Sequence, residues 1–126
     1  LAVIPPQASV AANTPLVPLL AHREVLVRFP FNTDYLDRKG RPQSVDWVAV
    51  DLDLLQRYGR AFAGDWRQLR NSKRWIEEHR QAYRVQSLEQ GVVVLQKEGP
   101  IHAPLELALD QTLQQPLPAN PRRRRS

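Results

Sequence analysis

The sequence predicts an α/β fold: a small Rossmann-like mixed sheet of about five strands, with parallel first strands, a C-terminal β-hairpin and three to four helices. Runs typical of strands alternate along the chain with stretches of helical period. Residues 45–52 (VDWVAVDL) are apolar on both faces, as in a strand that is covered on both sides. Two apolar runs flank Glu89-Gln90-Gly91, which indicates a tight hairpin.

The first elements are expected to form a right-handed, parallel β-α-β unit. Residues 8–12 (ASVAA) are a short apolar run, and residues 24–29 (EVLVRF) are a strand. Between them, residues 13–15 (NTP) predict a helix start, because Asn or Thr caps free backbone N–H groups and proline needs no donor in the first turn. Pro18 removes a later donor, so this helix is expected to be short.

The middle of the chain predicts a loop, the central strand and a helix. Residues 32–44 (NTDYLDRKGRPQS) are polar and are expected to be an unstructured loop. Residues 45–52 follow as the central strand of the sheet. The next helix is expected to stop at Gly64. Its apolar positions recur at helical spacing: Leu54, Leu55, Tyr58, Ala61 and Phe62.

A second helix is predicted to begin at Asp65, in a segment that resembles a capping box, and to break near Asn71-Ser72. Its apolar stripe comprises Trp75, Ile76, His79, Ala82 and Tyr83. Its charged side comprises Lys73, Arg74, Glu77, Glu78 and Arg80. Residues 83–88 and 91–97 then form the antiparallel hairpin, and residues 101–113 add a short helix.

The chain divides into one domain, residues 1–115, and a disordered tail rich in proline and arginine, residues 116–126. The formal net charge is +5, and the tail supplies four of the positive charges, from Arg122, Arg123, Arg124 and Arg125. Without them, 14 basic residues stand against 13 acidic ones. The domain therefore lacks the clustered cations that bind nucleic acid. The arginines themselves are able to contact an anionic membrane or a nucleic acid.

The sequence motifs of catalysis and cofactor binding are missing. The turn after the first strand reads AANTPLVP, whereas a dinucleotide-binding Rossmann domain carries G-x-G-x-x-G there. There is no cysteine, and His22, His79 and His102 are not at metal-ligand spacing. No Ser-His-Asp order or nucleophile elbow is present. We therefore predict no catalytic residue, no metal site and no cofactor in this chain.

The candidate ligand site lies at the carboxyl ends of the strands, where open α/β sheets bind ligands. It comprises Asn13 and Thr14 after the first strand, His22 and Arg23 at the end of the first helix, and Asp51 and Asp53 at the end of the central strand. Two carboxylates there are able to bind a cation or to act as acid and base. We favour the simpler interpretation that they cap the following helix. For His22, contact with the helix dipole is the simpler interpretation.

One long stretch, residues 4–30 (IPPQASVAANTPLVPLLAHREVLVRFP), resembles the C-terminal part of an uncharacterised family of bacterial predicted multi-pass membrane proteins. The matching patterns are an IPP-x-A-S-V entry, an L-x-P-x-L-x-x-R helix, a strand ending in F-P, a D-hydrophobic-D-L strand and a closing G-V-hydrophobic-L strand. They fall at residues 4–10, 16–23, 29–30, 45–52 and 90–95. The resemblance covers residues 3–97 and rests on structural residues.

The membrane part of that family is similar to multi-pass glycosyltransferases that use lipid-linked sugars. The resemblance implies an extracytoplasmic domain, on the periplasmic face of a bacterial membrane. It also implies two partners: the transmembrane part of the same protein, and a lipid-linked sugar or an acceptor. The catalytic acids of such enzymes lie in membrane-region loops, so none is carried over to this chain. The ending PRRRRS departs from the family.

The start of the chain supports an origin in a larger protein. The chain contains no methionine, and only a few residues precede its first element. We therefore expect it to be the end of a larger protein whose membrane helices are not part of this sequence. No run approaches the ~18 apolar residues of a spanning helix, so we expect the chain to be soluble as given.

Two other functions stay open. One is a stand-alone soluble binding module, with its ligand at the strand ends near Asn13, His22, Phe31 and Asp51, or with nucleic acid bound through the arginine tail. The other is an independent enzyme that uses Asp51 and Asp53. We rank the non-catalytic extracytoplasmic domain first, the binding module second and the enzyme third.

Overall fold

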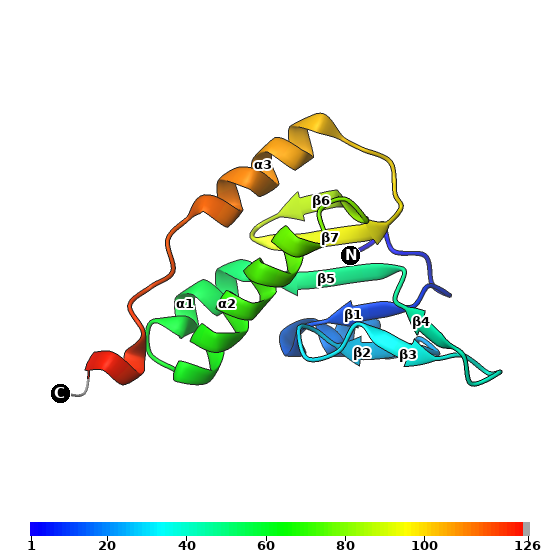
Figure 1. Ribbon diagram of the computed structural model, residues 1–126, viewed down its shortest axis with the longest axis horizontal. Coiled ribbons are helices and arrows are strands. Elements are labelled where there is room, and N and C mark those ends of the chain that lie inside the picture. Colours follow the sequence, from blue (N-terminus) through cyan, green and yellow to red (C-terminus); the bar gives the residue numbers. More distant parts are fainter. Residues whose placement is uncertain (125–126) are drawn as a thin grey trace.

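In the computed structural model, which describes residues 1–124, a five-stranded mixed sheet lies between two layers (Figure 1). Its strands are, in spatial order, β2 (Leu26–Arg28), β1 (Val10–Ala12), β5 (Trp47–Asp51), β7 (Val92–Lys97) and β6 (Tyr83–Glu89). One face carries the N-terminal segment and a 3-10 helix, η1 (Thr14–Leu20). The other face carries α1 (Leu52–Gly59), α2 (Ala63–Glu78) and α3 (Ala103–Gln114). The predicted α/β class and mixed sheet are confirmed.

The direction of the strands also follows the prediction. β1 pairs in parallel with β2 on one side and with β5 on the other. β7 pairs antiparallel with β5 and with β6, and the hairpin turn has positive φ at Gln90 (52°) and Gly91 (79°). β5 is the central strand and is buried on both faces, with Val48 and Val50 toward the α-helices and Ala49 toward η1.

Two predictions about the first half of the chain are wrong. The first helix is a 3-10 helix, with Pro18 inside it, and the Asn13 side chain does not cap it. The expected loop at residues 32–44 forms a hairpin of β3 (Asp34–Leu36) and β4 (Pro42–Ser44). Its turn is held by the Asp37 carboxylate, which accepts the N–H groups of Lys39 and Arg41, each at 2.9 Å. Strands of three residues are too short to show a period.

The end of α1 also differs from the prediction. α1 ends at Gly59, and Gly64, the predicted stop, lies inside α2. A Cβ atom at Gly59 would lie 3.3 Å from the Cα of Trp66. Glycine therefore allows α1 and α2 to approach closely at this point.

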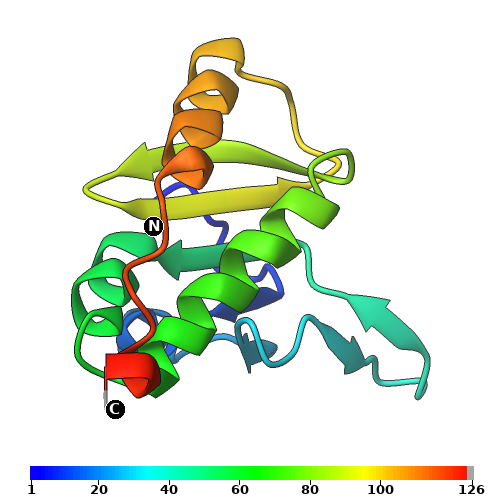
Figure 2. The same cartoon turned by 60° about the vertical axis from the view of Figure 1, so that its left-hand side comes forward.

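α2 is one continuous helix, so the predicted break at Asn71-Ser72 is wrong. Phe62 is its N-cap residue, and Asp65 lies in its first turn rather than at the cap. Lys73, which the helical period placed on the charged side, is buried. After α3 the chain returns over α1 and α2 and ends in a short 3-10 helix, η2 (Pro121–Arg124) (Figure 2).

Candidate functional site

A groove of about 430 Å³ lies beside the carboxyl ends of β1 and β5. η1, α1, the α1–α2 turn and α2 line this strand-end groove with Thr14, Pro15, Leu54, Leu55, Tyr58, Phe62, Asp65 and Gln68. From β1 the chain continues to β2 on one side of the sheet, whereas from β5 it continues to the β6–β7 hairpin on the other. Such a switch in direction, at the carboxyl ends of strands, is where α/β sheets bind ligands.

Two predicted site residues hold the strand ends together. Asn13 is fully buried, and its Oδ1 accepts the N–H of Asp51 at 3.1 Å. The Asp51 carboxylate accepts the N–H of Leu54 at 3.0 Å, which confirms that it caps α1. Within the described residues, Nδ2 of Asn13 is buried without an acceptor. The Asn13 carbonyl oxygen and the Asp51 carboxylate are therefore already engaged with the backbone.

The structure gathers four of the six predicted ligand-binding residues at one end of the sheet. Asp53 is exposed in the first turn of α1, beside Gly91, where a Cβ atom would lie 2.2 Å from the Asp53 Cγ. It joins Asn13, Thr14 and Asp51, and of these Thr14 lines the groove. His22 and Arg23 lie at the opposite end, before β2, and border a separate small hollow with Pro6, Leu19 and Leu20. The Arg23 guanidinium donates to the carbonyls of Ile4 and Pro5.

Sequence reasoning missed the residues that shape the groove. Tyr58 and Phe62 are 46% and 57% exposed, and their ring centroids are 6.3 Å apart. Helical spacing predicted both residues on one apolar stripe of a single helix. In the structure α1 ends at Gly59, so Phe62 lies outside it, at the N-cap of α2. Asp65 and Gln68 are three residues apart on α2, which puts an acid and an amide on one helix face. The i, i+3 spacing of Asp65 and Gln68 is the only feature of the sequence that indicated a polar side to this groove.

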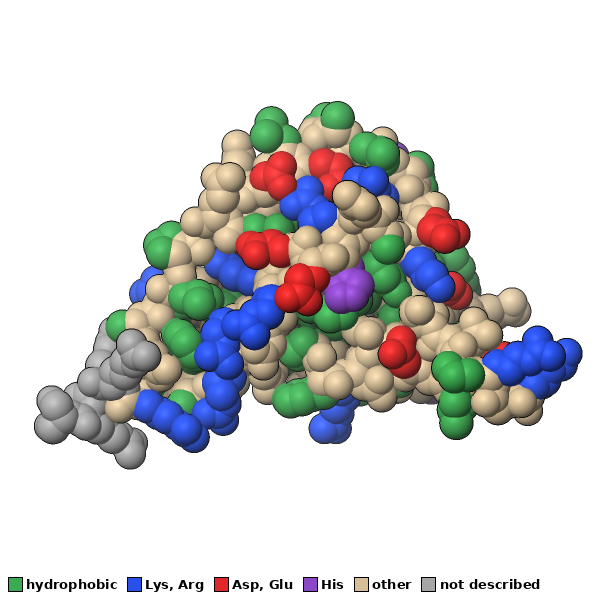
Figure 3. Space-filling model, in the orientation of Figure 1, with side chains coloured by type: hydrophobic (Ala, Val, Ile, Leu, Met, Phe, Trp, Pro, Cys, Tyr) green, Lys and Arg blue, Asp and Glu red, His purple; other side chains and the backbone are tan. Residues whose placement is uncertain are grey.

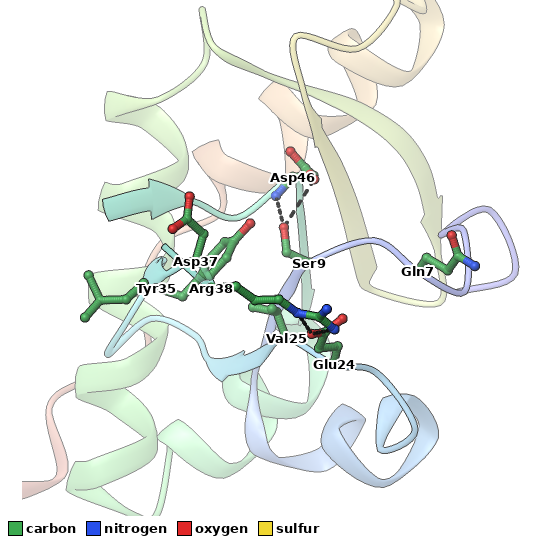
Figure 4. Close-up of a pocket in the computed structure, with 9 residues that line it drawn as sticks. Gln7, Ser9, Glu24, Val25, Tyr35, Asp37, Arg38 and Asp46 are labelled. Carbon is green, nitrogen blue, oxygen red and sulfur yellow. Dashed lines mark hydrogen bonds and ion pairs between the residues drawn. The ribbon is translucent and has the colours of Figure 1, made fainter. Parts of the chain in front are cut away.

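A second hollow, of about 410 Å³, lies at the other end of the same strands (Figure 4). In this polar hollow, Ser9 Oγ accepts the N–H of Asp46 at 2.8 Å and donates to its carboxylate at 3.3 Å. The Arg38 guanidinium donates to the Glu24 carboxylate at 2.6 and 3.0 Å. Donation from the Arg41 N–H lowers the pKa of Asp37 below its ordinary value. Paired groups thus dominate this hollow, which the sequence did not indicate.

The face of the molecule in Figure 3 carries charged side chains of both signs. Basic side chains gather at the tip of the β3–β4 hairpin, and acidic and basic side chains mix over α2 and α3 (Figure 3). Among residues 1–124, no three His, Cys, Asp or Glu side chains are placed to hold a metal ion. Of the tail arginines, Arg122 is exposed. The side chains of Arg123 and Arg124, and all of Arg125, lie outside the described residues.

A family model described as "Predicted membrane protein (DUF2079)" matches residues 1–94. The chain belongs to this family. The match spans β1 to β5, the three helices that line the strand-end groove, and β6, and it ends within β7. Membership confirms the membrane-protein part of the resemblance, and the likeness to glycosyltransferases stays a prediction. Across the part of the chain that the structure describes, no helix has the length and hydrophobicity to cross a membrane. No curated protein and no solved structure matches the chain.

Proposed function

We propose that this chain is a non-catalytic, extracytoplasmic domain of a membrane glycosyltransferase-like protein. Its strand-end groove binds the lipid-linked sugar or the acceptor of that protein. The observation that carries the proposal is the groove itself, an apolar and aromatic hollow with a few polar groups, at the switch point of the sheet. Family membership supplies the membrane context.

The lining of the groove suits a saccharide that carries an apolar part. The C–H faces of a sugar ring pack on exposed aromatic rings, which Tyr58 and Phe62 provide. Sugar hydroxyls donate to a carboxylate or an amide oxygen, which Asp65 and Gln68 provide. Leu54 and Leu55 offer apolar surface beside them.

Two observations support a domain that lies outside the membrane and performs no chemistry itself. The Asp51 carboxylate caps α1, which is a structural role, and Asn13 carries an amide that does not titrate. The exposed charges on α2 and on the β3–β4 hairpin suit a surface in contact with water. The extracytoplasmic side follows from the resemblance to the glycosyltransferase-like family.

Binding is tested on the full 126-residue chain by NMR titration with a polyprenyl-phosphate-linked hexose in detergent micelles. Phe62→Ala is expected to weaken binding about threefold to tenfold, because one aromatic face is lost. Phe31→Ala is the matched control, since Phe31 is 71% exposed and does not line the groove. Equal effects of both changes would contradict the proposal. The same spectral changes with empty micelles would contradict it as well.

The location is tested on the membrane protein as the cell makes it, with alkaline phosphatase fused after Ser126. This reporter needs disulfides and is active only in an oxidising compartment outside the cytoplasm. Active phosphatase is the expected result. Inactive phosphatase together with an active β-galactosidase fusion at the same position would place the domain in the cytoplasm.

A further inference from the structure

The segment that leaves α3, Gln115 to Pro118, runs along α1 and α2, and we call this segment the strap (Figure 2). Lys73 Nζ donates to the Gln115 carbonyl at 2.7 Å, Gln56 Nε2 to the Pro116 carbonyl at 3.4 Å, and Trp66 Nε1 to the Pro118 carbonyl at 2.7 Å. We call these three side chains the strap site.

The spacing of the strap site matches the repeat of an extended proline-rich chain. Trp66 and Lys73 are seven residues apart on α2, or about 10.5 Å along the helix. Three residues of polyproline II advance about 9.3 Å and complete one turn, so the carbonyls of Gln115 and Pro118 point the same way. Gln115 has φ −60° and ψ 133°, close to that conformation. Two donors on the same face of α2, about two helical turns apart, therefore meet two carbonyls that are one polyproline II turn apart.

Two of the three donors of the strap site, Trp66 and Lys73, have further contacts. The Arg70 guanidinium lies over the Trp66 ring, 5.2 Å from its centroid. Lys73 of α2 is buried, and its Nζ atom lies at the C-terminal end of α3, where a cation meets the negative end of that helix dipole. Pro118 also lies beside Gly59, where a Cβ atom would be in ordinary van der Waals contact with the Pro118 Cγ, at 3.6 Å.

We propose that Gln56, Trp66 and Lys73 form a docking site for an extended Pro-x-Pro segment, and that the chain's own residues 115–118 occupy it as a detachable strap. The site reads backbone carbonyls, which proline retains, and the prolines keep the segment extended before it binds. The side chains of Gln115, Pro116 and Leu117 are exposed, so recognition rests on the backbone and on proline conformation. The proposal is independent of the ligand of the strand-end groove.

The test uses the full chain and a fluorescent peptide, QQPLPAN, that copies residues 114–120. Wild-type protein is expected to bind the peptide at least tenfold more weakly than a Pro116→Gly, Pro118→Gly variant. In the wild type the tethered strap competes at an effective concentration on the order of millimolar. In the variant the strap loses its extended preference and vacates the site. Adding Trp66→Phe to the variant is expected to weaken peptide binding about threefold to tenfold, because one hydrogen bond is lost.

Three controls decide the outcome. Leu117→Ala leaves the carbonyls and both prolines intact, so it should not open the site to the peptide. The peptide QQGLGAN should bind the double variant at least about threefold more weakly than QQPLPAN, because it is not pre-extended. The indole N–H resonance of Trp66, assigned by its loss in Trp66→Phe, reports whether the strap has left. An unchanged resonance in the double variant, or a released strap with no peptide binding, would overturn the proposal.

Discussion

The two ends of β1 and β5 open onto hollows of similar size and opposite chemistry. At the carboxyl ends, the strand-end groove exposes Tyr58 and Phe62 beside Leu54 and Leu55. At the amino ends, the polar hollow is filled with pairs such as Ser9 with Asp46 and Glu24 with Arg38 (Figure 4). The carboxyl end therefore offers exposed apolar surface, whereas the amino end offers polar groups that already bond to one another.

The difference indicates which end is suited to a ligand. A ligand gains free energy by covering exposed aromatic surface, whereas it must first displace existing hydrogen bonds in a hollow of paired groups. The polar hollow is therefore better understood as the joint between the β3–β4 hairpin and the sheet. The substitutions below separate the two ends, and they are ordered from the largest expected effect to the smallest.

Leu55→Ala tests whether the groove rests on a packed core. Leu55 lines the groove but is only 3% exposed and belongs to the main hydrophobic core. Its truncation is expected to lower the free energy of unfolding by about 2–5 kcal/mol, measured by urea denaturation. Phe62→Ala, at the open rim, should change it by no more than about 0.5 kcal/mol. Equal losses would mean that the aromatic rim is part of the core.

Tyr83 tests the polar end through pH. Its hydroxyl donates to the carbonyl of Val45 at 2.6 Å, and burial, with smaller contributions from Asp46 and Asp34, raises its pKa from 10.0 to about 12. The unfolded state releases this proton first. The contribution to stability is thus complete below pH 10 and is lost as pH rises through 12, by about 2–3 kcal/mol in total. Tyr83→Phe should remove that loss between pH 9 and 12. Identical pH profiles would contradict the assignment.

Ser9→Ala tests the paired interior of the polar hollow. Ser9 is 5% exposed, and its hydroxyl is the acceptor for the N–H of Asp46. Removing the hydroxyl leaves that donor without its partner, so a loss of about 1–2 kcal/mol in the free energy of unfolding is expected. Thermal and urea denaturation measure it. No loss would show that water replaces the serine and that the hollow is open.

Arg38→Ala is expected to have the smallest effect. Its ion pair with Glu24 has side chains that are 87% and 68% exposed. Such exposed pairs contribute little to stability, and salt screens them. The difference between wild type and variant should therefore shrink further in 1 M NaCl. A large loss that persists in salt would indicate that Arg38 packs against the hairpin.

Long periodic segments were predictable, and close crossings were not. The buried strand at residues 47–51, the β6–β7 hairpin and the Asp51 cap follow from local patterns in the sequence. The hairpin at residues 34–44 was not predicted, because its strands have three residues each and are too short to show a period. The close approach of the Trp66 backbone to Gly59 could not be predicted, because these residues come near each other only after folding.

The sequence by itself determined the α/β class, the central strand and membership in a family of predicted membrane proteins, because these depend on periodicity and on local residue patterns. The tertiary structure alone decided where side chains from distant segments meet. It joined Thr14 to Phe62 in one groove, and it separated His22 and Arg23 from that groove. It also brought the Pro118 carbonyl to the indole N–H of Trp66, which donates a hydrogen bond to it. These contacts depend on how helices cross and how strands are ordered, and a local pattern does not record distances through space.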